Sequence, residues 1–126
     1  MNSVTSNAVA ARFNLLAYSN TEIKTGLKWI DGKDRYIKVV SIGSLPNVDT
    51  KNVNHGISNL YEVIRFQGLA HNSARNDFIP VPWVDKSSSA QYNVSLRITA
   101  TQISIATDGY MSTYSGYVIL EYTKSS

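Results

Sequence analysis

The chain has 126 residues, of which 43% are hydrophobic and 17% charged, and its formal net charge is +3. This length fits one domain, and the low fraction of charged residues excludes disorder driven by charge repulsion. The chain has no cysteine, which excludes a disulfide framework, a thiolate zinc site and a cysteine nucleophile. No apolar run approaches the ~20 residues of a membrane span, and the N-terminal residues are polar, so we expect neither a membrane span nor a signal peptide. The lysines and arginines are scattered along the chain, so we expect no patch that binds nucleic acid.

A helix is predicted over Thr5 to about Tyr18. Thr5 or Ser6 can cap the free N–H groups of the first turn, and the alanine-rich run that follows has fair to high helix propensity. A helix of this length is marginal alone in water, so it needs a partner surface.

An apolar stripe on this helix consists of Val9, Phe13 and Leu16. The stripe can pack against the rest of the chain, or it can pair with other copies as a short coiled coil. We place the helical segment at residues 1–19 and a β domain at residues 20–126.

The remaining residue types favour β structure, because the chain has eleven valines, eleven isoleucines, nine threonines and eight tyrosines. Ile23, Leu27 and Trp29 alternate with polar or small residues, and Asp31-Gly32 then indicates a two-residue type I′ hairpin turn. Further expected elements are strands over residues 35–42, 50–54 and 61–69, a helical turn over residues 57–60, and loops over residues 43–49 and 70–77.

Prolines mark residues 78–84 as an edge strand. Pro80 and Pro82 alternate with three apolar residues, so two N–H groups are missing from the same side of the strand. That side cannot carry a regular ladder of hydrogen bonds.

The C-terminal third predicts three more strands. Residues 92–98 alternate, the apolar phase then shifts at a turn near residues 100–102, and the next strand opens at Ile103 and ends at Asp108-Gly109. The last strand, Tyr117–Thr123, is apolar on both faces, so it is either central under a second layer or buried by another subunit.

Seven or eight short strands separated by turns predict an all-β fold, a β-sandwich of jelly-roll-like or Greek-key type. Alternation assigns its core to Ile23, Leu27, Trp29, Ile37, Val39, Ile64, Phe66, Ile79, Val81, Val94, Leu96, Ile98, Ile103, Ile105 and Ile119.

Catalytic and cofactor motifs are missing. The nine carboxylates show no diagnostic pair, and the chain has no P-loop, GxGxxG or GxSxG motif. His55 and His71 lie in predicted loops without metal-ligand spacing, so both are expected to be solvated. We expect no catalytic residues, no metal and no cofactor.

A binding surface is the chemistry that remains. Trp29 and Trp83 are in phase with apolar strand faces and are expected in the core, whereas Tyr110 and Tyr114 follow a turn. Aromatic rings beside polar groups suit sugar recognition. The candidate ligand-binding residues are Tyr110, Tyr114, His71, Arg75, Asn76 and Asp77.

Several segments together resemble the C-terminal head domain of phage and prophage fibre proteins. They are the opening SVTSNAVA at residues 3–10, WIDGK at 29–33, IGSLPN at 42–47, NVNHGI at 52–57, FIPVP at 78–82 and SGYVILEYTK at 115–124. The resemblance implies a homotrimeric β-sandwich at the tip of an extracellular fibre of the virion. In that assembly residues 1–19 would end a stalk, and the candidate interface residues are Val9, Phe13, Leu16, Val118, Leu120 and Tyr122.

The function expected from this resemblance is non-enzymatic receptor binding, with a bacterial surface glycan or protein as the partner. One alternative is a structural fibre-end or head-fibre module that joins three chains and binds no ligand. The other is a glycan depolymerase, which would require a carboxylate pair a few ångströms apart.

Overall fold

The structure is a computed structural model that describes residues 18–84 and 92–125. These residues form eight strands and no helix. The strands are β1 (Ile23–Lys28), β2 (Asp34–Ser44), β3 (Thr50–Asn54), β4 (Leu60–Asn72), β5 (Asp77–Val81), β6 (Val94–Ile98), β7 (Gln102–Thr107) and β8 (Tyr114–Lys124).

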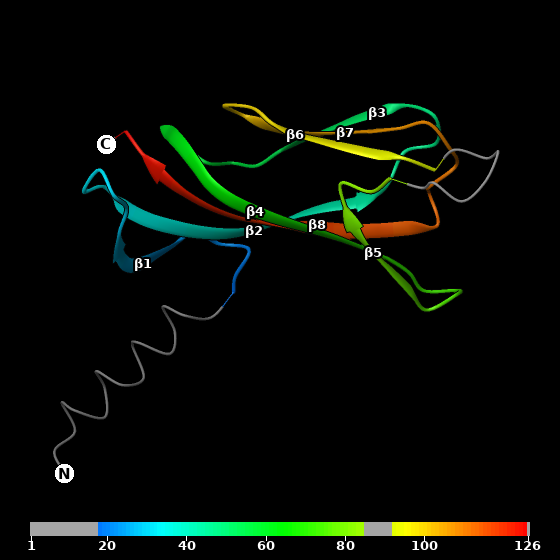
Figure 1. The fold of residues 1–126 in the computed structure, drawn as a ribbon, viewed down its shortest axis with the longest axis horizontal. Helices are drawn as coiled ribbons and strands as arrows, with labels where there is room; N and C mark the ends of the chain where they lie inside the picture. Colours follow the sequence, from blue (N-terminus) through cyan, green and yellow to red (C-terminus); the bar gives the residue numbers. More distant parts are fainter. Residues whose placement is uncertain (1–17, 85–91, 126) are drawn as a thin grey trace, which may run out of the picture.

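Two antiparallel sheets face one another (Figure 1), so the all-β prediction is confirmed and the arrangement fits a β-sandwich. The larger sheet has five strands in the order β1-β2-β8-β4-β5, and the smaller has three in the order β3-β7-β6. The predicted helix, with Val9, Phe13 and Leu16, lies outside the described residues. At residue 19 the chain already contacts the β domain, because the Ser19 carbonyl accepts a hydrogen bond from the Val39 N–H at 2.9 Å.

The core lies between the central strands of the two sheets. Val118, Leu120 and Tyr122 of β8 are 0% exposed, as are Ile103 and Ile105 of β7. All five belong to one cluster of buried side chains. Full burial of one such side chain stabilises a fold by about 1.5–3 kcal/mol.

The predicted core is correct in part. Five of its members are buried, namely Ile79, Val81, Val94, Ile103 and Ile105. Eight are half-buried, namely Ile23, Trp29, Ile37, Val39, Ile64, Leu96, Ile98 and Ile119. The prediction is wrong for Leu27 and Phe66, which are 51% and 43% exposed.

The apolar pattern of β2 and β8 explains why their predicted core residues are only half-buried. Both strands are apolar on both faces, so alternation does not show which face is buried. In the register, Val40 pairs with Val118 and Val39 pairs with Ile119. Because Val118 points into the core, Val39 and Ile119 lie on the opposite, outer face of the sheet.

The turn between β1 and β2 lies at Asp31-Gly32, as predicted, but it is not type I′. The Trp29 N–H donates to the Lys33 carbonyl and the Gly32 N–H donates to the Trp29 carbonyl, both at 2.9 Å. Gly32 has a φ of +87°, whereas Asp31 is not in the left-handed region. This is the pattern of a three-residue loop that ends in a left-handed glycine.

The prediction of an edge strand at the prolines is confirmed for Pro80, whereas Pro82 lies just beyond the end of this strand at Val81. β5 lies at one edge of the five-stranded sheet and pairs with β4, with Pro80 opposite Leu69. The chain then reaches the smaller sheet, where Trp83 and Val94 exchange two backbone hydrogen bonds at 3.0 and 2.9 Å.

Two other expectations are wrong. Residues 57–60 are not a helical turn, because Asn59 has a φ of +56° and β4 begins at Leu60. The loop expected over residues 70–77 is reduced to residues 73–76, because β4 continues to Asn72 and β5 begins at Asp77.

Candidate functional site

A cavity of about 440 Å³ lies where the β4–β5 hairpin meets the segment that leads into β8. We call it the end cavity. In Figure 1 the β4–β5 hairpin is at the right, at the opposite end of the molecule from the C-terminus. The lining combines aromatic side chains with hydrogen-bonding groups; the polar ones include Asn72, Arg75, Asp77 and Thr113, and the aromatic ones are Phe78, Trp83, Tyr92, Tyr110 and Tyr114.

Asn72 organises the hairpin side of the end cavity. Its buried Oδ1 accepts hydrogen bonds from the N–H groups of Ala74 at 3.1 Å and Arg75 at 3.4 Å. Its Nδ2 donates to Thr113 Oγ1 at 3.2 Å. This one amide therefore shapes the loop that carries Arg75 and joins it to the segment before β8.

Asp77 and Tyr114 form the polar floor of the end cavity. The Tyr114 hydroxyl donates to Asp77 Oδ2 at 2.5 Å. That hydrogen bond, together with burial, raises the pKa of Tyr114, while the nearby Arg75 acts in the opposite direction. Within residues 18–84 and 92–125, the Arg75 guanidinium makes no hydrogen bond or ion pair, so its donors remain available to a ligand.

Of the five aromatic side chains of the end cavity, Phe78, Tyr92 and Tyr110 are exposed, Trp83 is half-buried and Tyr114 is buried. Tyr110 is 76% exposed, yet its backbone forms a bridge with Asn47, whose Oδ1 also accepts the Ser112 N–H at 2.9 Å. Trp83 is held by its two backbone hydrogen bonds to Val94. Rigid rings beside hydrogen-bonding groups can stack on the apolar face of a ligand and orient its polar groups.

The structure brings together four of the six predicted ligand-binding residues: Tyr110, Tyr114, Arg75 and Asp77 line the end cavity. His71 and Asn76 do not line it. The His71 ring lies 3.2 Å from Asn76 Oδ1 and stacks on Phe78 with a centroid distance of 4.2 Å. Successive residues of a strand point to opposite faces, so Asn72 points to the end cavity and His71 away from it.

Sequence reasoning missed Trp83 as a site residue and assigned it to the core. The side chain is only partly buried and lines the end cavity. The assignment to the core was right in one respect, because Trp83 also packs against the buried cluster.

Burial decides two further expectations, one about His55 and one about the candidate interface residues of β8. The prediction that His55 is solvated is wrong: it is 1% exposed, its Nδ1 accepts the Ile57 N–H at 3.1 Å, and its Nε2 donates to the Thr99 carbonyl at 2.9 Å. The candidate interface residues Val118, Leu120 and Tyr122 are buried within the single chain at 0% exposure, which leaves their side chains no surface for contact with a second subunit.

Among the described residues, no three His, Asp or Glu side chains lie close enough together to hold a metal ion. The same ranges contain no helix that could cross a membrane. No protein-family model matches the chain, and neither does any curated protein or solved structure. The resemblance to fibre heads therefore stays an expectation.

Proposed function

We propose that the chain is a non-enzymatic binding module whose end cavity recognises a glycan on a bacterial surface. The observation that carries the proposal is the convergence of exposed aromatic rings with Arg75 and Asp77 in one cavity. A sugar presents C–H faces that stack on rings such as Tyr110 and Trp83. Its hydroxyls can donate to Asp77 and accept from Arg75.

The biological setting we propose is the tip of a phage fibre, formed as a homotrimer of β-sandwich heads. The sequence resemblance supports this setting, and the two-sheet all-β fold is compatible with it. The predicted helical stripe of Val9, Phe13 and Leu16 would join the three chains, so residues 1–19 would act as the end of a stalk.

The end cavity favours binding over glycan cleavage. Hydrolysis in most glycosidase families uses two carboxyl groups on either side of the bond. Asp77 is the one carboxylate among the described residues that line this cavity. Its Oδ2 accepts a hydrogen bond from Tyr114, an arrangement suited to orienting a ligand.

A glycan array tests the proposal with two pairs of variants. Tyr110→Ala and Arg75→Ala remove exposed groups of the end cavity, while Tyr61→Ala and Arg97→Ala remove exposed residues of the same types elsewhere. We expect the first pair to weaken binding at least tenfold and the second pair to bind like wild type. A folded protein that binds no glycan, or equal effects of the two pairs, would overturn the proposal.

A further inference from the structure

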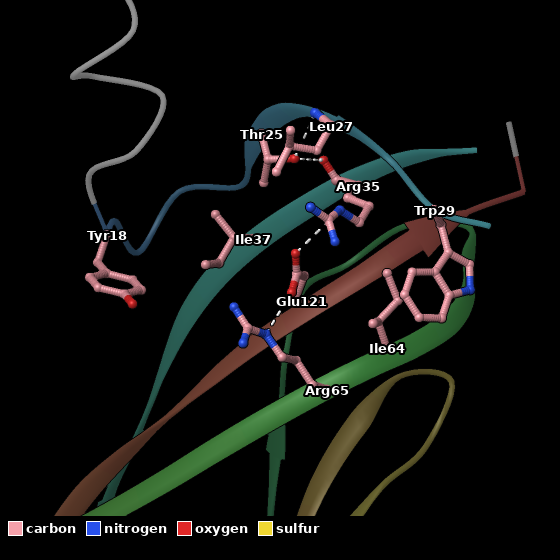
Figure 2. Close-up of a pocket in the computed structure, with 9 residues that line it drawn as sticks. All are labelled: Tyr18, Thr25, Leu27, Trp29, Arg35, Ile37, Ile64, Arg65 and Glu121. Carbon is pink, nitrogen blue, oxygen red and sulfur yellow. Dashed lines mark hydrogen bonds and ion pairs between the residues drawn. The ribbon is translucent and has the colours of Figure 1, made fainter. Parts of the chain in front are cut away.

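A second cavity, of about 510 Å³, lies on the outer face of the five-stranded sheet, and Figure 2 shows the side chains that line it. We call it the arginine cavity. β2, β8 and β4 contribute Arg35, Glu121 and Arg65 to its centre. The arginine cavity shares no lining residue with the end cavity.

Glu121 lies between the two arginines of this cavity (Figure 2). Its side chain is 7% exposed, with Oε1 at 2.6 Å from Arg65 Nε and Oε2 at 3.5 Å from Arg35 Nε. A buried carboxylate needs such compensation. Two guanidinium groups against one carboxylate nevertheless leave the centre of the cavity with one excess positive charge.

The two guanidinium groups also retain unused donors. Each has five N–H groups, and in both cases the Nε is the atom that faces Glu121. Within the described part of the chain, the terminal nitrogens make no hydrogen bond, and the buried Arg35 Nε makes only its 3.5 Å ion-pair contact. The Arg65 side chain is 75% exposed, and its terminal nitrogens lie on the side away from Glu121 (Figure 2).

The apolar part of the lining reduces the screening of this positive charge. Leu27, Trp29, Ile37 and Ile64 are among the lining residues, so part of the surroundings is apolar and screens charge less than water does. Trp29 is half-buried and lies beside Ile64 in this lining (Figure 2), so its ring can add an apolar contact to a ring-shaped ligand. Paired N–H groups of a guanidinium match the two oxygens of a carboxylate.

We propose that the arginine cavity binds a carboxylate-bearing sugar of the uronate type. The carboxylate accepts hydrogen bonds from the exposed terminal nitrogens of Arg65, Arg35 adds positive charge on the other side of Glu121, and the sugar ring packs against the apolar lining that includes Trp29. This goes beyond the proposed function, because the site lies on different residues and its ligand carries a negative charge.

The two tryptophans of the chain allow the cavities to be tested separately, because Trp29 lines the arginine cavity and Trp83 lines the end cavity. In the Trp83→Phe protein, fluorescence excited at wavelengths that tyrosine does not absorb comes from Trp29 alone. D-Glucuronate and D-glucose are matched probes, since the first carries a carboxylate where the second has a hydroxymethyl group. We expect a saturable fluorescence change with glucuronate, none with glucose at equal concentration, and weaker binding at high salt.

Variants of Arg65 complete the test. Arg65→Gln should weaken glucuronate binding at least tenfold, Arg65→Lys should weaken it less, and Arg97→Gln on β6 should have no effect. Circular dichroism verifies that each variant is folded; we expect all to be, because Glu121 keeps its contact with Arg35 and because Gln and Lys retain a hydrogen-bond donor. No fluorescence change, an equal response to glucose, or unaltered binding by Arg65→Gln would overturn the proposal. A change of oligomeric mass in Arg65→Gln without any glucuronate binding would also overturn it and assign the face to contacts between copies.

Discussion

Replacement of Tyr122 by phenylalanine is expected to destabilise the β domain by about 1.5–3 kcal/mol at neutral pH, the range for a hydrogen bond to a charged group. The Tyr122 ring is 0% exposed and stacks on Tyr36, with a centroid distance of 5.9 Å. Its hydroxyl donates to Glu22 Oε1 at 2.5 Å. Phenylalanine retains the ring and creates no large cavity, and Glu22 keeps its ion pair with Lys124 at 3.0 Å. The Tyr122→Phe variant therefore loses one charge-assisted hydrogen bond, the one to Glu22.

The same residue makes stability depend on pH. Burial, and then the hydrogen bond to Glu22, raise the pKa of Tyr122 above its ordinary value. The unfolded chain loses this proton near pH 10, whereas the folded chain retains it. The stabilisation is thus complete below about pH 10 and falls by about 1.4 kcal/mol per pH unit above it. The Tyr122→Phe variant lacks this effect, so its deficit relative to wild type should shrink above pH 10.

Urea unfolding followed by circular dichroism, at one fixed protein concentration, measures both effects. Tyr110→Phe is the control, because Tyr110 is 76% exposed, and its change should stay within about 0.5 kcal/mol. A Tyr122→Phe protein as stable as this control would refute the reasoning, as would a deficit that stays constant from pH 8 to pH 11.

The other predictions concern backbone packing, a buried histidine and assembly. Gly116→Ala would place a Cβ 2.0 Å from the Leu69 carbonyl oxygen, so we expect its cooperative thermal transition by circular dichroism to be lost; retention of that transition, as in the control Ser115→Ala, would contradict this. His55→Ala removes both ring hydrogen bonds from a buried site and should cost about 2–4 kcal/mol by urea unfolding, so an unchanged midpoint would show that the ring is dispensable. Leu16→Asp would put an unpaired charge in the predicted coiled-coil seam and should weaken trimers more than it perturbs the β fold. Light scattering across a dilution series decides this last case, and a monomeric wild-type protein at micromolar concentration would rule out the trimer.

Strand positions could be predicted where alternation and turns agree. β3 has the predicted bounds, and β5 lies at a sheet edge as predicted, with Pro80 in the strand. The buried face could not be predicted for β2 and β8. Each carries apolar side chains on both faces, and one of these faces lies on the outer side of the sheet, where Ile37 and Ile119 remain half-buried.

The end cavity could be predicted in part because Arg75 lies in the loop of the β4–β5 hairpin, Asp77 directly follows this loop, and Tyr110 lies between β7 and β8. The arginine cavity could not, because Arg35, Arg65 and Glu121 meet only once β2, β8 and β4 are known to be neighbours. One signal was present: Glu121 is a lone carboxylate between apolar residues of a strand, and such a charge needs a partner when it is buried.

Titration of an array-selected glycan into the Trp29→Phe protein, whose only tryptophan is Trp83, tests glycan recognition by the end cavity most directly. The predicted result is a saturable change in fluorescence that Tyr110→Ala and Arg75→Ala each weaken at least tenfold. Binding that leaves Trp83 fluorescence unchanged and is insensitive to both substitutions would contradict the assignment, because the glycan would then occupy another surface.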